Sequence, residues 1–171
     1  MMKIVAALKA GVMSLFCLMS ALSFGPAHAD ASAVNLVGAW SLVAADVLHA
    51  DGTRTRDYGA APKGLLLIDA QGRYSLQIFK AERPRFASGE KLSGTPAEFE
   101  AAVMGSSTHF GAIDIDPVGR TLTFRIENAS FPNLDGAQQK RLYELNGDEL
   151  SYRVPTRPDG NTPISVWRRL K

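Results

Sequence analysis

The feature that most restricts the fold of this chain is a series of short segments in which apolar and polar residues alternate. Residues 121–127 show it best, because polar side chains separate Leu122, Phe124 and Ile126. A period of two places successive side chains on opposite faces of a β-strand. Residues typical of turns separate these segments at short intervals. The pattern therefore predicts an antiparallel β-sandwich or barrel.

We expect nine strands, at residues 36–45, 53–58, 64–69, 73–79, 108–115, 121–129, 137–145, 149–154 and 164–170. In the first strand, Trp40, Leu42 and Ala44 are expected to share one face. The third and fourth strands form the clearest hairpin. Their three-residue connection ends in Gly72, which suits a turn that needs a positive φ. Tyr74 is expected on the apolar face of the second arm.

One segment, residues 96–104, predicts a short helix instead of a strand. Thr95 and Glu98 form a Thr-x-x-Glu capping box, and Pro96 suits the first helical position. Gly105 can end the helix. A helix of this length is unstable alone, so we expect its apolar side to pack on the sheet or over an opening.

The first 29 residues have the pattern of a Sec-type signal peptide. Lys3 and Lys9 supply positive charge, residues 11–24 are apolar, and Ala27-His28-Ala29 resembles a cleavage site. We expect cleavage after Ala29 and a periplasmic or secreted protein. Residues 30–171 then form a single domain.

Charge and cysteine content narrow the range of partners. Residues 30–171 hold 17 basic and 17 acidic side chains, so the net charge of +2 comes from the first 29 residues. A neutral domain gives no reason to expect nucleic acid or a membrane surface as partner. The single cysteine, Cys17, lies in the predicted signal peptide, which leaves the domain without a disulfide or a thiolate metal site. We expect no cofactor.

Several short motifs follow one another along the predicted domain. They are Leu36-Val37-Gly38-Ala39-Trp40-Ser41-Leu42, Pro62-Lys63-Gly64-Leu65-Leu66, Asp69-Ala70-Gln71-Gly72-Arg73-Tyr74, Arg83-Pro84-Arg85-Phe86-Ala87-Ser88, Gly94-Thr95-Pro96-Ala97-Glu98, Phe110-Gly111, Ser130-Phe131-Pro132-Asn133, Gln139-Lys140-Arg141 and Trp167-Arg168-Arg169. In order and spacing, these motifs resemble the bacterial lipocalin-like domain family. The resemblance implies an all-β, antiparallel, lipocalin-like barrel of about eight to ten strands, with a calyx and one short helix. It implies little about chemistry, because one fold supports many functions.

The resemblance also assigns a structural role to residues from the first and last strands of the domain. Gly38 and Trp40 resemble the lipocalin Gly-x-Trp element, in which the tryptophan closes the base and stacks with an arginine from the last strand. Either Arg168 or Arg169, next to Trp167, could supply that arginine.

Two arginines, Arg83 and Arg85, flank Pro84 in a polar segment before the helix. Guanidinium groups bind carboxylates with two parallel hydrogen bonds, so the pair could form an anion clamp at the barrel mouth. The alternative is a solvated loop in which these arginines pair with nearby carboxylates.

His109 follows a run of hydroxyl residues and could act as a general base. The simpler interpretation is a partly buried, hydrogen-bonded histidine, since the sequence shows no third orienting group. Asp114 and Asp116 fall on one strand face, but too few partner ligands are in view, and Asp116-Pro117 suits a turn. We expect no metal site.

Arg125, Tyr143 and Tyr74 complete the candidate ligand-binding residues, as polar groups that could orient a molecule inside a barrel. The sequence favours a non-enzymatic protein that binds a small, mainly hydrophobic molecule in its cavity. It leaves open an anionic group on that molecule. Two alternatives also stay open: an isomerase- or cyclase-type enzyme acting on an apolar substrate, and a filled barrel that serves as an interaction module. Ligand identity and oligomeric state are not determined.

Overall fold

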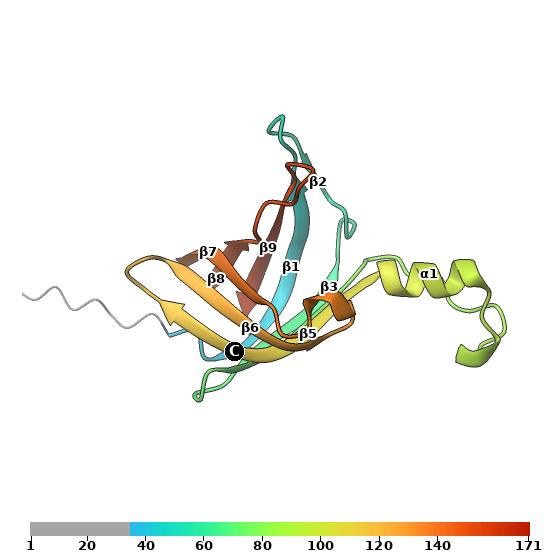
Figure 1. Cartoon of the computed structure of the whole chain (residues 1–171), viewed down its shortest axis with the longest axis horizontal. Helices are drawn as coiled ribbons and strands as arrows, with labels where there is room; N and C mark the ends of the chain where they lie inside the picture. Colours follow the sequence, from blue (N-terminus) through green and yellow to red (C-terminus); the bar gives the residue numbers. More distant parts are fainter. Residues whose placement is uncertain (1–34) are drawn as a thin grey trace, which may run out of the picture. The chain divides into compact units, whose positions relative to one another are not determined.

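The structure, a computed structural model, describes residues 35–171 (Figure 1). The predicted signal peptide and its cleavage after Ala29 lie outside the described residues. No helix within residues 35–171 is long and apolar enough to cross a membrane.

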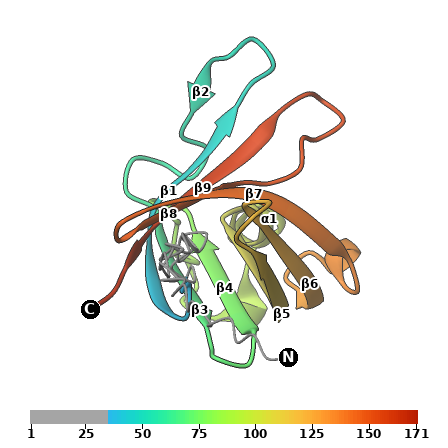
Figure 2. The same cartoon turned by 90° about the vertical axis from the view of Figure 1, so that its left-hand side faces the viewer.

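In the described part of the chain, nine strands form a single antiparallel sheet that closes on itself. They are β1 (Gly38–Leu48), β2 (Arg54–Thr55), β3 (Lys63–Ile68), β4 (Arg73–Phe79), β5 (Ser106–Asp116), β6 (Thr121–Ala129), β7 (Gln138–Asn146), β8 (Glu149–Arg153) and β9 (Thr162–Arg169). β1 pairs with both β3 and β9, so β1 and β3–β9 make an eight-stranded barrel. β2 pairs only with the end of β1, beyond the barrel wall (Figure 2). The expected antiparallel barrel is therefore confirmed.

A β-bulge in β1 corrects one prediction. The pairing of β1 with β9 shifts register between Leu42 and Ala44. Trp40 and Leu42 are buried before the bulge, and Ala45 and Val47 are buried after it. The prediction that Ala44 shares their face is wrong, because the extra residue of a bulge reverses the alternation that follows it.

The β3–β4 hairpin has the predicted turn. The Asp69 N–H donates to the Arg73 carbonyl over 2.9 Å, and Gly72 has a φ of +76°. The predicted strand at 53–58 is shorter in the structure, where only Arg54 and Thr55 pair.

The helix α1 (Pro96–Met104) begins with the predicted capping box, since Thr95 and Glu98 bond each other's backbone N–H groups. None of its residues is buried. The expected packing on the sheet or over the opening is not what the structure has. α1 extends beyond the strands (Figure 1), its Phe99 packs against Phe86 of the preceding loop, and Val103 and Met104 at its end line the barrel opening. Two short 3₁₀ turns, η1 (Lys91–Ser93) and η2 (Pro132–Leu134), complete the fold.

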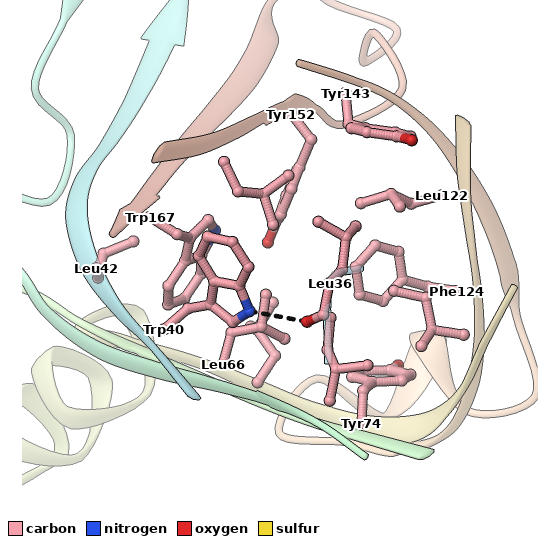
Figure 3. Close-up of a cluster of buried hydrophobic side chains, with 14 of the residues drawn as sticks. Leu36, Trp40, Leu42, Leu66, Tyr74, Leu122, Phe124, Tyr143, Tyr152 and Trp167 are labelled. Carbon is pink, nitrogen blue, oxygen red and sulfur yellow. Dashed lines mark hydrogen bonds between the residues drawn. The ribbon is translucent and has the colours of Figure 1, made fainter. Parts of the chain in front are cut away.

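A tightly packed aromatic core fills one end of the barrel (Figure 3). Trp40 and Trp167 are fully buried there, and the Trp40 indole N–H donates to the Leu36 carbonyl over 3.0 Å. The Arg169 guanidinium lies 4.1 Å from the centre of the Trp40 ring. Arg169, and not the exposed Arg168, therefore supplies the stacking contact that the sequence left open.

Candidate ligand-binding cavity

The other end of the barrel contains a cavity of about 520 Å³. Its walls come from the second halves of β1, β4 and β8, the first halves of β5, β7 and β9, and the end of α1. The apolar residues along it are Ala45, Val47, Tyr58, Leu76, Ile78, Val103, Met104, Phe131, Leu134, Tyr152, Val154, Pro155, Pro163 and Ile164. Trp40 and Trp167 lie in the opposite halves of β1 and β9, so they close the barrel below the cavity.

A buried arginine, Arg141, is the most unusual residue of the cavity wall. It is only 4% exposed. Its guanidinium carbon lies 4.0 Å from the centre of the Phe124 ring and 5.1 Å from that of Tyr152. Its Nη2 donates to Gln139 Oε1 over 2.6 Å and lies 3.3 Å from His109 Nε2. Within residues 35–171, Arg141 makes no ion pair, and its buried Nε has no hydrogen-bond partner.

His109 is held between Arg141 and Tyr74, and is 6% exposed. An arginine can only donate hydrogen bonds, so Nε2 of His109 accepts and the proton resides on Nδ1. Nδ1 then donates to the Tyr74 hydroxyl oxygen over 2.8 Å. Burial, followed by the charge of Arg141, lowers the pKa of His109 to about 3. The ring is therefore neutral at pH 7 with both nitrogens engaged, an arrangement that fits a structural histidine better than a general base.

The two predicted tyrosines belong to the core and not to the cavity wall. Tyr74 packs edge-to-face against Phe124, with 4.8 Å between ring centres, and it meets the cavity only through its bond to His109. Burial raises the pKa of Tyr74 well above that of an exposed tyrosine. Tyr143 is also buried, and it belongs to the hydrophobic cluster.

The three other predicted arginines lie outside the cavity lining. Arg83 is exposed and covers the Phe79 ring, 4.9 Å from its centre. Arg85 is exposed as well. Arg125 projects from the outer face of β6 and pairs with Asp114 over 2.7 Å. Arg83 and Arg85 thus lie outside the cavity lining, and an anion clamp formed by them stays a prediction.

The two aspartates weighed as metal ligands have other partners. Asp114 pairs with Arg125, and Asp116 Oδ1 accepts the backbone N–H groups of Val118 and Gly119 in the turn between β5 and β6. In the part of the chain that the structure describes, no three acidic, histidine or cysteine side chains are grouped to hold a metal ion.

The sequence reasoning missed Arg141 and Gln139 as cavity residues. A signal for them exists: Gln139, Arg141 and Tyr143 are two residues apart along β7 and therefore share a face. The inward orientation of Tyr143 places Arg141 inside, and Leu142 is exposed between them. A leucine facing outward beside an arginine facing inward reverses the usual pattern.

Comparisons with known proteins identify the family to which the chain belongs. A family model described as a lipocalin-like domain matches residues 37–170. No curated protein matches the chain. One similar solved structure is a lipocalin-like protein from Bacteroides uniformis, with 16% identity, a TM-score of 0.42, and coverage of 79% of this chain and 98% of that one. Another is a mutant of the fluorescent protein UnaG, with 14% identity, a TM-score of 0.36, and coverage of 78% and 95%. Because the family match spans most of its length, the chain belongs to the lipocalin-like domain family.

Proposed function

We propose that this protein binds a small, mainly apolar molecule in the open half of its barrel. The observation that carries the proposal is the cavity of about 520 Å³, whose lining is predominantly apolar with a small polar cluster around Arg141. Cavities of this size with few polar groups are typical of small-molecule sites. Membership of the lipocalin-like family supports the same function, since such barrels commonly bind hydrophobic ligands.

The mouth of the cavity also suits an apolar ligand. Val103 and Met104 at the end of α1 are 63% and 64% exposed, and both line the cavity. Phe131, in the loop after β6, lines it too and is also largely exposed. A ligand that covers these side chains removes apolar surface from water, which favours binding by about 25 cal/mol per Å².

The test uses N-phenyl-1-naphthylamine, a neutral dye whose fluorescence rises in apolar surroundings. We expect the protein to bind it and Ile78→Trp to abolish binding, because Ile78 lines the cavity and a larger side chain fills it. Ile164→Phe, a smaller change on the same lining, should weaken binding less. The matched control is Gln77→Trp, on the exposed face of the same strand.

Circular dichroism establishes that each variant is folded. No binding by the folded wild-type protein would contradict the proposed function, and so would equal binding by the wild-type protein and Ile78→Trp. Native mass spectrometry after mild purification then identifies any molecule that is purified with the protein.

We also propose that residues 1–29 direct export and are removed after Ala29, so that the protein acts in the periplasm or outside the cell. The support is the charged, apolar and small-residue pattern of those residues. The intact mass of protein recovered from the exported fraction should correspond to a chain that begins at Asp30. A chain that keeps Met1 would contradict the proposal.

A further inference from the structure

The chemistry of the ligand can be argued from the imbalance of hydrogen-bonding groups around Arg141. Arg141 presents several N–H donors, yet among residues 35–171 only Gln139 Oε1 and His109 Nε2 accept from them. Both bonds use Nη2. Nε is buried without a partner, and Nη1 makes no hydrogen bond to the described residues.

The charge of Arg141 is likewise not balanced by a carboxylate. Two acidic residues, Asp46 and Asp57, contribute to the cavity lining. Asp46 Oδ2 accepts from Arg54 Nε over 2.7 Å, whereas its buried Oδ1 has no partner among the described residues. Asp57 accepts from the Thr55 hydroxyl over 2.8 Å. Neither forms an ion pair with Arg141.

A buried cation without a counter-charge is unfavourable unless other groups stabilise it. The Phe124 and Tyr152 rings provide part of that stabilisation through their faces. The rings attract the positive charge of the guanidinium. They do not accept hydrogen bonds from its in-plane N–H groups, which therefore stay unsatisfied. A group that brings both negative charge and acceptor oxygens would satisfy both needs.

Gln139 extends the same donor-rich surface. Its Oε1 already accepts from Arg141, which directs its amide NH₂ elsewhere, and that NH₂ makes no hydrogen bond to the described residues. His109 adds no free acceptor, because Nε2 faces Arg141 and Nδ1 faces Tyr74. The cluster around Arg141 therefore keeps unused donors on Arg141 and Gln139. Elsewhere the lining also contains Arg157, four serine hydroxyls (Ser106, Ser107, Ser130 and Ser165) and the buried hydroxyl of Tyr152, which can donate as well as accept.

We propose that the ligand is an apolar monocarboxylic acid whose carboxylate binds to Arg141, with the Gln139 amide as a second donor. The inference rests on the proposed function, since it assigns the ligand class of the same cavity. The planar guanidinium matches the two oxygens of a carboxylate. The apolar remainder of the acid then lies along the cavity toward Val103, Met104 and Phe131.

The test measures displacement of bound N-phenyl-1-naphthylamine by two matched pairs of compounds. Each pair joins an acid to an alcohol with the same apolar skeleton: dodecanoate with 1-dodecanol, and 2-naphthoate with 2-naphthylmethanol. We expect at least one acid to bind about tenfold to a hundredfold more tightly than its alcohol, the range of a charge-assisted hydrogen bond.

Two substitutions of Arg141 and one control identify the residue responsible. Arg141→Gln should remove most of the preference for the acid, measured as the ratio of its affinity to that of the matching alcohol. Arg141→Lys, which retains a charge without the planar fork, should keep part of the preference. Arg125→Gln, on the outer face, should change neither. If Arg141→Gln does not fold, the lysine variant and the wild-type pairs still decide the question.

The possible outcomes separate this inference from the proposed function. Dye binding with no preference for either acid, or with no displacement by any of the four compounds, overturns the carboxylate assignment and leaves the apolar cavity intact. A preference that survives in both Arg141 variants overturns the role of Arg141. Absence of dye binding by the wild-type protein overturns the proposed function itself, and the inference with it.

Discussion

The contacts of Arg169 at the closed end predict a large stability effect from one exchange, Arg169→Ala. The Arg169 guanidinium covers the Trp40 ring at 4.1 Å. Its Nη1 donates to the Val37 carbonyl over 2.8 Å, and its Nη2 donates to the Asn35 carbonyl over 2.6 Å. One side chain thus ties the last strand to the segment that precedes β1 and covers the tryptophan at the base.

The magnitude follows from these three contacts. Each hydrogen bond from the charged donor contributes about 1 kcal/mol net, because water can replace the arginine at an exposed carbonyl. The cation–π contact adds about 0.5–1 kcal/mol. We therefore expect Arg169→Ala to lower the free energy of unfolding by about 2–4 kcal/mol, which corresponds to a fall in Tm of roughly 10 °C for a domain of this size.

Urea unfolding, followed by far-UV circular dichroism and by tryptophan fluorescence, measures the change. Arg169→Lys should be intermediate, since it keeps the charge and loses the fork that reaches two carbonyls. Arg168→Ala is the matched control: Arg168 is exposed and lies 3.3 Å from Glu149, so its loss should change stability by less than about 0.5 kcal/mol. Equal destabilisation by Arg169→Ala and Arg168→Ala would refute the reasoning.

Three further exchanges test other parts of the fold. Burial lowers the pKa of His109 from 6.5 to about 3, so as the pH falls below about 6.5 the unfolded chain takes up a proton that the folded barrel does not. Stability should therefore drop by about 2 kcal/mol more between pH 7 and 5 in the wild-type protein than in His109→Gln, and parallel pH profiles would contradict this. Gly64→Ala places a Cβ 2.5 Å from the Gln77 carbonyl oxygen, so urea unfolding should show a loss of about 2 kcal/mol or more in the free energy of unfolding. An unfolding midpoint equal to that of the wild-type protein would mean that β3 and β4 move apart to fit the methyl group at no cost. Thr95→Ala removes the helix cap, so hydrogen exchange of the backbone amides in residues 96–104 should become about fivefold faster. The Tm should change little, because no residue of α1 is buried. A large fall in Tm would mean that α1 supports the barrel.

Much of the fold is readable in the sequence because its signals are local. The alternation at Leu122, Phe124 and Ile126 predicts both the strand and its buried face. Gly72 marks a turn that needs a positive φ, and Thr95 with Glu98 marks the helix start. Each signal depends on residues only a few positions apart, so the covalent chain itself carries it.

The candidate site was harder to predict. Arg83 and Arg85 have the right chemistry for an anion, but they are exposed on the polar segment before α1. Arg141 has the same chemistry and is buried, but the sequence indicates this only once Tyr143, two residues further along β7, is known to face inward. The bulge after Leu42 could not be predicted from the sequence either. The extra residue in β1 is recognised only when the register of β1 against β9 is known.

The sequence by itself determined the class of fold, the order of the strands and their turns, and the capped helix, because alternation, turn residues and capping pairs act over a few residues. Only the tertiary structure decided where the barrel is filled and where it is hollow. That depends on which side chains from distant strands meet: Trp40 with Trp167 and Arg169 at one end, and His109 with Arg141 at the other. Closure of β1 onto β9 brings together the first and last strands, which are more than 110 residues apart in the sequence. No local pattern specifies which part of the barrel interior such long-range contacts leave unfilled.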